Sequence, residues 1–189
     1  MKITITGPRS VGKSTISKIV AKKLDLKFIS SDKIGEKSMK KYGGLDKAIK
    51  SGIIGKFIKN SAYGLIREVY RKDNFVFDLS GGAFASRKYN EASKKVRETA
   101  KKNSIIIGLL PSKNARESID LLFLREGKRD HFKGMDKLEL LEKVKEDFMK
   151  YPRILDRYCD FIIYTKGKSS KDVADEIVKK IKNKMTRLK

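Results

Sequence analysis

The chain has 189 residues, and its 46 Lys and Arg against 23 Asp and Glu give a formal net charge of +23. A chain of this length buries a sizeable core without cross-links, and a single cysteine, Cys159, excludes an internal disulfide framework. No window approaches the roughly 18 apolar residues of a membrane span, and the N-terminus lacks the apolar stretch of a signal peptide. We therefore expect a cytoplasmic protein that does not insert into membranes.

The excess of positive charge favours anionic partners without identifying one, because net charge reports on association and not on fold. The C-terminal run of lysines from Lys179 to Lys189 is typical of the solvated face of a helix, and the chain has no Trp to form a stacking platform. We expect nucleic acid to bind weakly and non-specifically, if at all, and a monomer is the favoured oligomeric state.

Five short runs with apolar residues predict strands at 3–6, 26–30, 75–79, 105–110 and 161–164, and the first of these runs is β-branched throughout. Helical spacing of apolar residues predicts helices at about 13–24, 92–101, 115–124 and 137–150, and Ser169-x-x-Asp172 resembles a capping box that opens a last helix. Residues 33–72 predict two or three short helices outside the core, and residues 125–134 an exposed loop. Alternating strands and helices indicate one α/β domain over 1–189, with a five-stranded parallel sheet in three α/β/α layers.

Residues 7–14 read GPRSVGKS and match the phosphate-binding pattern G-x-x-x-x-G-K-[ST] between a predicted strand and a predicted helix. Glycines let the backbone approach phosphate oxygens, so successive N–H groups and the helix N-terminus form an anion site. We expect ATP phosphates to bind here, Lys13 to reach the β and γ phosphates, and Ser14 to ligate Mg²⁺. The predicted nucleotide-binding residues are Gly7, Arg9, Ser10, Val11, Gly12, Lys13, Ser14 and Thr15.

This loop, the strand 26–30 and the following Asp32 resemble P-loop kinases of small molecules and nucleoside monophosphates. Gly81-Gly82-Ala83 after a strand, Arg129 in a basic loop, and the last strand 161–164 are similar to features of shikimate kinases. The resemblance implies a P-loop fold with an acceptor-binding arm at 33–72 and a lid at 125–136. It also implies transfer of the γ-phosphoryl group of ATP, with Mg²⁺, to the hydroxyl of shikimate.

The resemblance implies a role for several individual residues. Lys13, Asp32 and Arg129 are the expected catalytic residues, and Arg125 is a second loop arginine that could neutralise developing charge. Ser14 and Asp78 are the expected metal ligands. The expected acceptor-binding residues are Asp32, Lys59, Gly81, Gly82 and Arg153.

The acceptor side of the site departs from the shikimate kinase pattern. Ser30 stands where the family has the first of two carboxylates, and Asp78, in the apolar run Phe-Val-Phe-Asp-Leu, could supply the missing charge. The arginine that the family has beside a phenylalanine would follow Phe57, but Ile58 and Lys59 stand there. The family's second acceptor-binding arginine would fall near Tyr151, with Arg153 and Arg157 only nearby.

Two other functions therefore stay open. A nucleoside monophosphate kinase of the cytidylate or adenylate type would need cations for its acceptor's phosphate, such as Lys56, Lys59, Arg67 or Arg87. A P-loop NTPase that binds RNA would instead use nucleotide hydrolysis as a switch.

Overall fold

The computed structural model describes residues 1–44, 47–48, 51–128 and 134–187. Five parallel strands form one sheet in the order β2-β3-β1-β4-β5. The strands are β1 (Lys2–Thr6), β2 (Lys27–Ser30), β3 (Phe75–Asp78), β4 (Ile105–Leu110) and β5 (Phe161–Tyr164). The predicted strands and the parallel sheet are confirmed.

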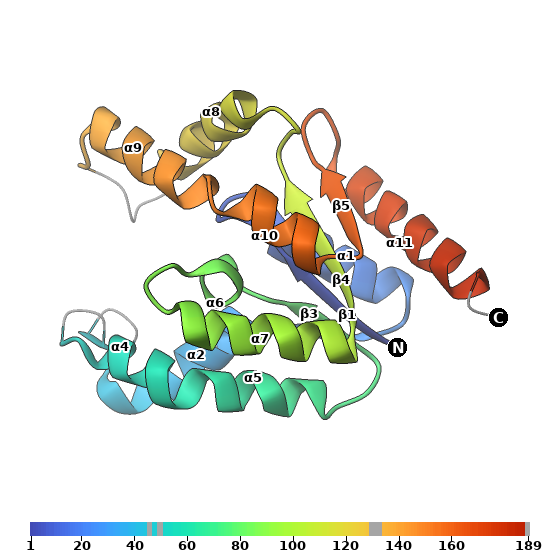
Figure 1. Cartoon of the computed structure of the whole chain (residues 1–189), viewed down its shortest axis with the longest axis horizontal. Helices are drawn as coiled ribbons and strands as arrows, with labels where there is room; N and C mark the ends of the chain where they lie inside the picture. The colour runs from blue at the N-terminus through green and yellow to red at the C-terminus, as the bar shows by residue number, and fades with distance from the viewer. Residues whose placement is uncertain (45–46, 49–50, 129–133, 188–189) are drawn as a thin grey trace.

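Helices cover both faces of this sheet (Figure 1). One face carries α1 (Lys13–Lys23) packed against α11 (Ser170–Thr186), and the other carries α7 (Asn90–Asn103), α10 (Tyr151–Tyr158) and α5 (Tyr63–Tyr70). The remaining elements are α2 (Ser31–Met39), the 3₁₀ turn η1 (Lys40–Tyr42), α4 (Ile53–Phe57), the π-helical turn η2 (Ile58–Ala62), α6 (Gly81–Ala85), α8 (Ala115–Glu126) and α9 (Lys137–Phe148). The predicted three-layer arrangement is confirmed.

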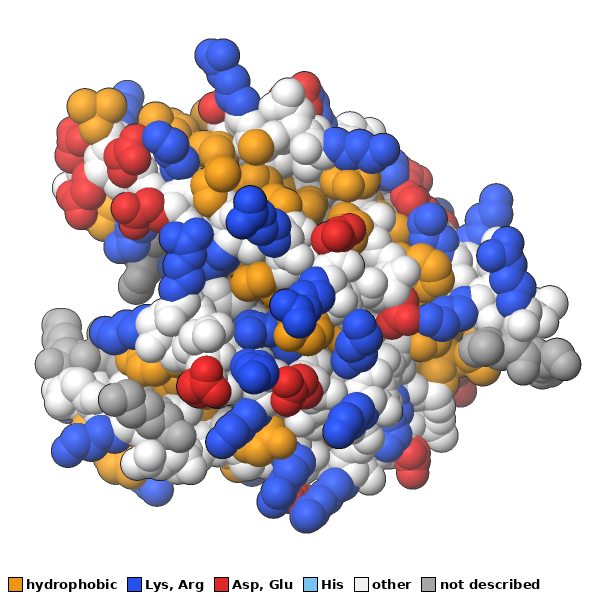
Figure 2. Space-filling view, in the orientation of Figure 1, with side chains coloured by type: hydrophobic (Ala, Val, Ile, Leu, Met, Phe, Trp, Pro, Cys, Tyr) orange, Lys and Arg blue, Asp and Glu red, His pale blue; other side chains and the backbone are white. Residues whose placement is uncertain are grey.

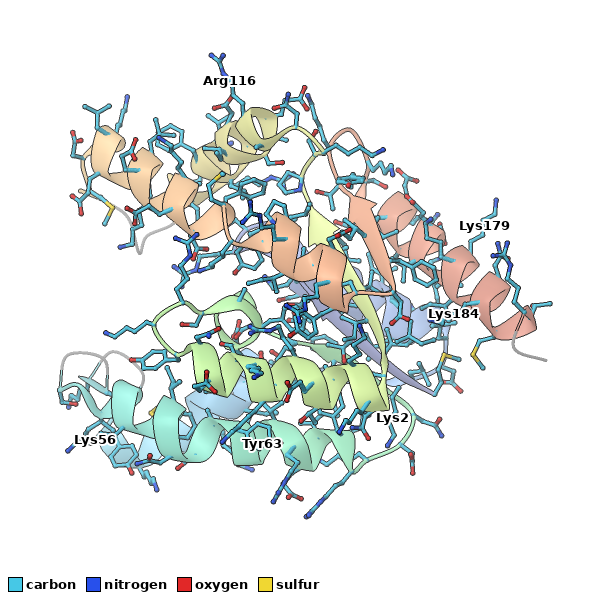
Figure 3. All side chains as sticks on the ribbon, viewed as in Figure 1. Lys2, Lys56, Tyr63, Arg116, Lys179 and Lys184 are labelled. Carbon is cyan, nitrogen blue, oxygen red and sulfur yellow. The ribbon has the colours of Figure 1, made fainter. Side chains whose placement is uncertain are left out.

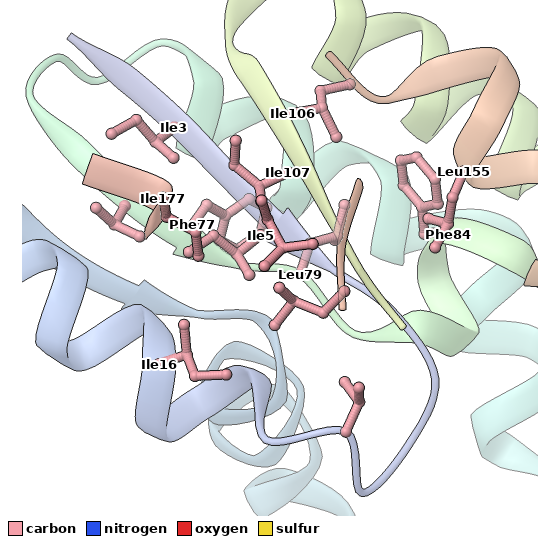
Figure 4. Close-up of a cluster of buried hydrophobic side chains, with 14 of the residues drawn as sticks. Ile3, Ile5, Ile16, Phe77, Leu79, Phe84, Ile106, Ile107, Leu155 and Ile177 are labelled. Atoms are coloured by element: carbon pink, nitrogen blue, oxygen red, sulfur yellow. The ribbon is translucent and has the colours of Figure 1, made fainter. Parts of the chain in front are cut away.

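The core lies on both faces of the central strand β1 and of its two neighbours, β3 and β4 (Figure 4). Ile3 and Ile5 of β1 and Ile107 of β4 are fully buried, as expected for strands that helices cover on both sides. Burial of the intervening Thr4 is balanced by hydrogen bonds between its hydroxyl and those of Tyr70 (3.0 Å) and Ser104 (2.8 Å).

Side-chain caps fix where several helices begin. Ser169 accepts from the backbone N–H of Asp172, whose carboxylate accepts from the N–H of Ser169, so the predicted capping box of α11 is confirmed. Ser30 and Ser80 accept from the third backbone N–H of α2 and α6 respectively. Both capped helices start at the carboxyl edge of the sheet, where the site is built.

Three sequence-based expectations need correction. Helix α5 was placed outside the core, but Ile66, Val69 and Tyr70 are buried in it because the helix packs against α7. The loop expected from residue 125 begins later, since α8 runs to Glu126 and carries Arg125.

The third correction concerns the segment before the last strand. The predicted helix 137–150 ends at Phe148, and a separate helix, α10, follows at Tyr151–Tyr158. Pro152 lies in the first turn of α10, where its missing N–H costs no hydrogen bond, so it starts a helix there instead of only ending one.

Candidate active site

The loop between β1 and α1 is shaped by glycines at both ends. A Cβ on Gly7 would lie 2.3 Å from the carbonyl oxygen of Leu109 on β4, so only glycine fits there. Gly12 precedes α1 with φ of 100°, in the left-handed region that glycine favours. The backbone therefore wraps closely around the N-terminus of α1, which points its N–H groups into the loop.

Two basic side chains brace this loop. Nζ of Lys13 donates to the carbonyl oxygen of Pro8 over 2.9 Å, which holds the ammonium over the loop. Nη1 of Arg125 on α8 donates to the carbonyl oxygen of Ser10 over 3.2 Å. Ser10 has φ of 60°, an unfavourable conformation for a residue with a Cβ, so the bond from Arg125 stabilises a strained part of the loop.

Asp78 lies beside the start of α1. The Ser14 hydroxyl donates to Oδ2 of Asp78 over 2.6 Å, and Asp78 is almost fully buried at the end of β3. Burial raises the pKa of Asp78 above its ordinary value, and the Ser14 hydrogen bond and the Lys13 ammonium oppose this rise. A hydroxyl and a carboxylate at the N-terminus of α1 are oxygen donors of the type that Mg²⁺ takes together with nucleotide phosphates.

Asp32 stands in the first turn of α2, next to the end of β3. The strand register pairs Ser30 with Asp78, which brings the start of α2 to the buried carboxylate. The N–H of Ser80 donates to the Ser31 hydroxyl over 2.8 Å and ties α2 to the turn before α6. The carboxylate of Asp32 is close enough to Asp78 to raise the pKa of that residue further.

Gly81 lies where three segments meet. A Cβ on Gly81 would lie 2.2 Å from the hydroxyl oxygen of Tyr151 and 2.4 Å from the carbonyl oxygen of Gly7. On the adjacent Gly82 a Cβ would meet no atom within 4 Å. Gly81 therefore allows α6, α10 and the phosphate loop to approach one another, whereas Gly82 borders open space.

Two cavities that share part of their lining open at this edge of the sheet. The first, here called the nucleotide cleft, has a volume of about 790 Å³ and runs from the loop (Arg9, Lys13–Thr15) past Gly81 and Tyr151 to a wall of apolar and charged side chains on α8 and α9. The surface is hollowed between the α8–α9 pair and the α4–α7 side of the molecule (Figure 2). The second, here called the acceptor pocket, has a volume of about 410 Å³ and lies among α2, α5, α6 and α7.

The two cavities share Arg9, Asp32, Ser80 and Gly82. The carboxylate of Asp32 thus lies between the phosphate-binding loop, in the nucleotide cleft, and the acceptor pocket. A sequence profile of the family described as Shikimate kinase matches residues 9–182. The chain belongs to the shikimate kinase family.

Solved structures agree with this assignment at the level of fold. Shikimate kinase from Acinetobacter baumannii, in complex with shikimate, is 22% identical with a TM-score of 0.73, and the match covers 97% of this chain and 93% of that chain. Shikimate kinase from Bacteroides thetaiotaomicron is 17% identical with a TM-score of 0.73, over 96% and 98%. A deoxyadenosine kinase from M. mycoides, with dCMP and a flexible dCDP bound as products, is 16% identical with a TM-score of 0.55, over 97% and 100%.

A search of curated proteins found no match. Membership of the shikimate kinase family makes the chain an ATP-dependent phosphotransferase that acts on a small substrate. In the part of the chain that the structure describes, no helix combines the length and apolarity needed to cross a membrane.

The structure of this shikimate kinase family member brings most of the expected site residues together. Arg9, Ser10, Gly12, Lys13, Ser14 and Thr15 line the nucleotide cleft, whereas Val11 turns its side chain into the core. Gly81 lines the cleft, and Asp32 and Gly82 line both cavities.

Other expected residues lie elsewhere. Arg153 lines neither cavity, because it lies two residues after Tyr151 on α10 and residues two apart face different sides of a helix. Lys56 and Arg67 also line neither cavity, and Lys56 lies at the outer side of the arm (Figure 3). Arg87 lines the nucleotide cleft and not the acceptor pocket. Arg129 and the side chain of Lys59 lie outside the described residues.

Several cleft residues were missed by sequence reasoning. Lys150 and Tyr151 line the cleft at the point where an arginine was sought, and Lys150 forms an ion pair with Asp147. Glu126, at the end of α8, is buried at the cleft, and neither of its carboxylate oxygens has a hydrogen-bond partner among the described residues. For Lys150 and Tyr151, Pro152 was a usable sequence signal, because a proline can stand in the first turn of a helix and so indicates the start of α10.

Proposed function

We propose that this protein transfers the γ-phosphoryl group of Mg·ATP to a hydroxyl group of a small metabolite held in the acceptor pocket. The observation that carries the proposal is the place of Asp32, which lines both cavities where they meet. A carboxylate there faces both the phosphate loop and the bound acceptor. Phosphoryl transfer needs chiefly this positioning, together with stabilisation of charge.

The proposed reaction transfers one phosphoryl group and one proton. The acceptor hydroxyl gives its proton to the carboxylate of Asp32, and its oxygen forms a bond to the γ-phosphorus. The bond from that phosphorus to the β–γ bridging oxygen breaks, and ADP leaves with its electron pair. The ammonium of Lys13 and the N–H groups at the start of α1 stabilise the negative charge that spreads over the phosphoryl oxygens.

Ser14 and Asp78 fit a magnesium ion bound with the nucleotide, because their oxygens meet at the N-terminus of α1. The ion, when bound, neutralises phosphate charge. Arg129 is proposed as a lid residue that reaches the transferred group.

For the acceptor, the family supports shikimate ahead of any nucleoside monophosphate. A nucleoside monophosphate would bring a phosphate into the acceptor pocket, and Arg9 is the one cation among the described side chains that line it. Of the cations expected for such an acceptor, Lys56, Arg67 and Arg87 do not line the pocket, and the side chain of Lys59 lies outside the described residues. A nucleoside monophosphate kinase is therefore the weaker candidate.

A screen of ATP consumption tests the proposal. The purified protein is assayed with shikimate, small alcohols and each nucleoside monophosphate, with Lys13→Ala as the matched control. We expect ATP use that depends on a hydroxyl acceptor, a larger rate with shikimate than with any nucleoside monophosphate, and less than about a tenth of the rate in Lys13→Ala. Strong phosphorylation of CMP or AMP with none of shikimate would reverse the order of the two candidates.

A further inference from the structure

Arg9, the third residue of the phosphate loop, differs from the rest of the loop in what it lines. Most loop residues, Lys13 and Ser14 among them, line the nucleotide cleft and not the acceptor pocket. Arg9 lines both, and it is the only residue of the loop from Gly7 to Thr15 that lines the acceptor pocket. The loop therefore presents one exposed cation to the acceptor as well as to the nucleotide.

The backbone on both sides of Arg9 is held in place. The carbonyl oxygen of Pro8 accepts from Nζ of Lys13 over 2.9 Å, and that of Ser10 accepts from Nη1 of Arg125 over 3.2 Å. Ser10 also has φ of 60°, a backbone conformation that persists only where the surrounding contacts impose it. The Arg9 side chain thus starts from a fixed point, so a ligand that binds it has little backbone left to order.

The charge of Arg9 acts where the two cavities meet. Burial raises the pKa of the Tyr151 hydroxyl, the Asp147 carboxylate adds to this rise, and the Arg9 guanidinium opposes it. The Tyr151 hydroxyl lies against Gly81, because a Cβ on that glycine would be 2.2 Å from its oxygen. The next residue, Gly82, lines both cavities. The guanidinium is therefore close to the boundary between nucleotide and acceptor.

A cation at this boundary suits an acceptor that is itself an anion. Asp32, the proposed partner of the reacting hydroxyl, lines the same two cavities as Arg9. An anionic acceptor must approach both this carboxylate and the nucleotide phosphates, and a positive charge beside them reduces the repulsion. A guanidinium offers parallel N–H donors that match the two oxygens of a carboxylate, and such pairs are stronger than neutral hydrogen bonds.

We propose that Arg9 binds the carboxylate of a hydroxy-acid acceptor while Asp32 holds the hydroxyl that reacts. This inference rests on the proposed kinase function and names a residue that selects the acceptor by its charge. It gives Arg9 an acceptor-binding role in place of the nucleotide-binding role expected from the sequence. The family pattern has its acceptor-binding arginines after Phe57 and near Tyr151, where this chain has other residues.

A matched pair of acceptors tests the role of Arg9. Shikimate and its methyl ester carry the same hydroxyl groups, and only shikimate carries a negative charge. We expect Arg9→Gln to lower kcat/KM for shikimate by about ten- to a hundredfold, mainly through KM, because a charge-assisted hydrogen-bonded pair is lost. The same variant should keep kcat/KM for the ester within about threefold of the wild-type value.

Two further variants complete this comparison. Arg67→Gln is the matched control, because Arg67 is an exposed arginine of α5 that lines neither cavity, and it should keep both wild-type values. Arg9→Lys should recover part of the loss for shikimate, since an ammonium keeps the charge but not the paired donors. Equal losses for shikimate and the ester in Arg9→Gln overturn the inference, because Arg9 would then act on the transferred group. An unchanged value for shikimate overturns it as well.

Nucleotide binding is measured separately, by titrating each protein with a fluorescent analogue of ADP. The Kd for Arg9→Gln should stay within about threefold of the wild-type Kd. A Kd raised by more than about tenfold, in a variant that still prefers shikimate to its ester as wild type does, assigns Arg9 to the nucleotide and overturns the inference. Circular dichroism checks the fold of each variant, and Arg9→Lys carries the test if Arg9→Gln does not fold.

Calorimetry separates a failure of this inference from a failure of the kinase proposal. Shikimate should bind the wild-type protein, saturated with ADP, about ten- to a hundredfold more tightly than it binds Arg9→Gln. Equal affinities overturn the inference and leave the kinase function standing. If no acceptor raises ATP consumption above that of Lys13→Ala, the kinase proposal itself falls.

Discussion

The hydroxyl of Ser14 donates to Oδ2 of Asp78 over 2.6 Å and joins the start of α1 to the end of β3. The two residues are 64 positions apart in the chain, and the parallel pairing of β1 with β3 brings them together. This contact places a buried carboxylate under the phosphate loop. Burial raises the pKa of Asp78, so keeping this carboxylate charged lowers the stability of the folded protein. The same carboxylate is a proposed magnesium ligand, and such a loss of stability is common at functional sites.

Replacing Asp78 by Asn should therefore stabilise the metal-free protein at neutral pH. The folded-state pKa is raised, so the folded state binds this proton more readily than the unfolded state, and stability falls as pH rises above the unfolded value of about 4. Asp78→Asn removes that loss. We expect its Tm advantage over wild type, measured in EDTA from pH 4 to 8, to grow as pH rises from about 4 and to level off once the folded-state carboxyl is ionised. A lower Tm for Asp78→Asn at every pH would contradict this explanation.

A magnesium titration should separate the roles of the two carboxylates. Asp32→Asn should lower kcat while ATP still binds, because the group that orients or deprotonates the hydroxyl is lost. Asp78→Asn should act mainly through the metal, so raising Mg²⁺ should restore part of its activity and leave Asp32→Asn unchanged. If both variants are equally insensitive to Mg²⁺, Asp78 has a structural role and the carboxylate absent at Ser30 has no replacement.

The adjacent glycines Gly81 and Gly82 should respond differently to alanine. Gly81→Ala should destabilise the protein by about 1–3 kcal/mol, because its Cβ would overlap the Tyr151 hydroxyl and the Gly7 carbonyl. Gly82→Ala is the matched control and should be neutral or slightly stabilising, since its Cβ meets no atom within 4 Å and alanine favours a helix. Urea unfolding of both variants measures the difference. Equal stabilities would show that α10 and α6 can move apart at no cost.

The charge of +23 should produce weak, salt-dependent binding to nucleic acid. Lysines lie on several faces, and Lys179 and Lys184 of α11 are far from Lys56 in Figure 3. Contacts would therefore be to phosphates, and fluorescence anisotropy with two unrelated RNA sequences should give similar affinities. We expect each to fall at least roughly tenfold between about 50 and 200 mM salt. A sequence-dependent complex that persists at physiological salt would favour the RNA-linked NTPase.

Local sequence determined the secondary structure around the phosphate loop. The runs that form β1 and β4 are short, β-branched and bounded by glycine or proline, so their strand conformation needs few distant contacts. The loop itself was predictable for the same reason, because its glycines and Lys13 act within one turn of chain. The capping box at Ser169 is equally local.

Helices α5 and α10 were less predictable. Scattered glycines in 33–72 interrupt the apolar pattern, so the sequence did not indicate that one face of α5 is buried. That burial follows from the packing of α5 against α7 and from the hydrogen bond between the Tyr70 and Thr4 hydroxyls. Pro152 reads equally well as a stop signal and as a first-turn residue. Pro152 is a first-turn residue here because the residues after it pack into the core, as the fully buried Leu155 shows.

The sequence alone determined a P-loop, a parallel sheet and a carboxylate, Asp32, directly after the second strand, because each follows from neighbouring residues and the order of strands. Only the tertiary structure decided that Tyr151, and not Arg153, meets Gly81 at the cleft, since the start of α10 fixes which side chain faces it. It also decided the character of the acceptor pocket. The walls of the acceptor pocket come from α2, α5, α6 and α7, which are distant in sequence. No local pattern therefore predicts whether the surface that these helices form together is charged or apolar.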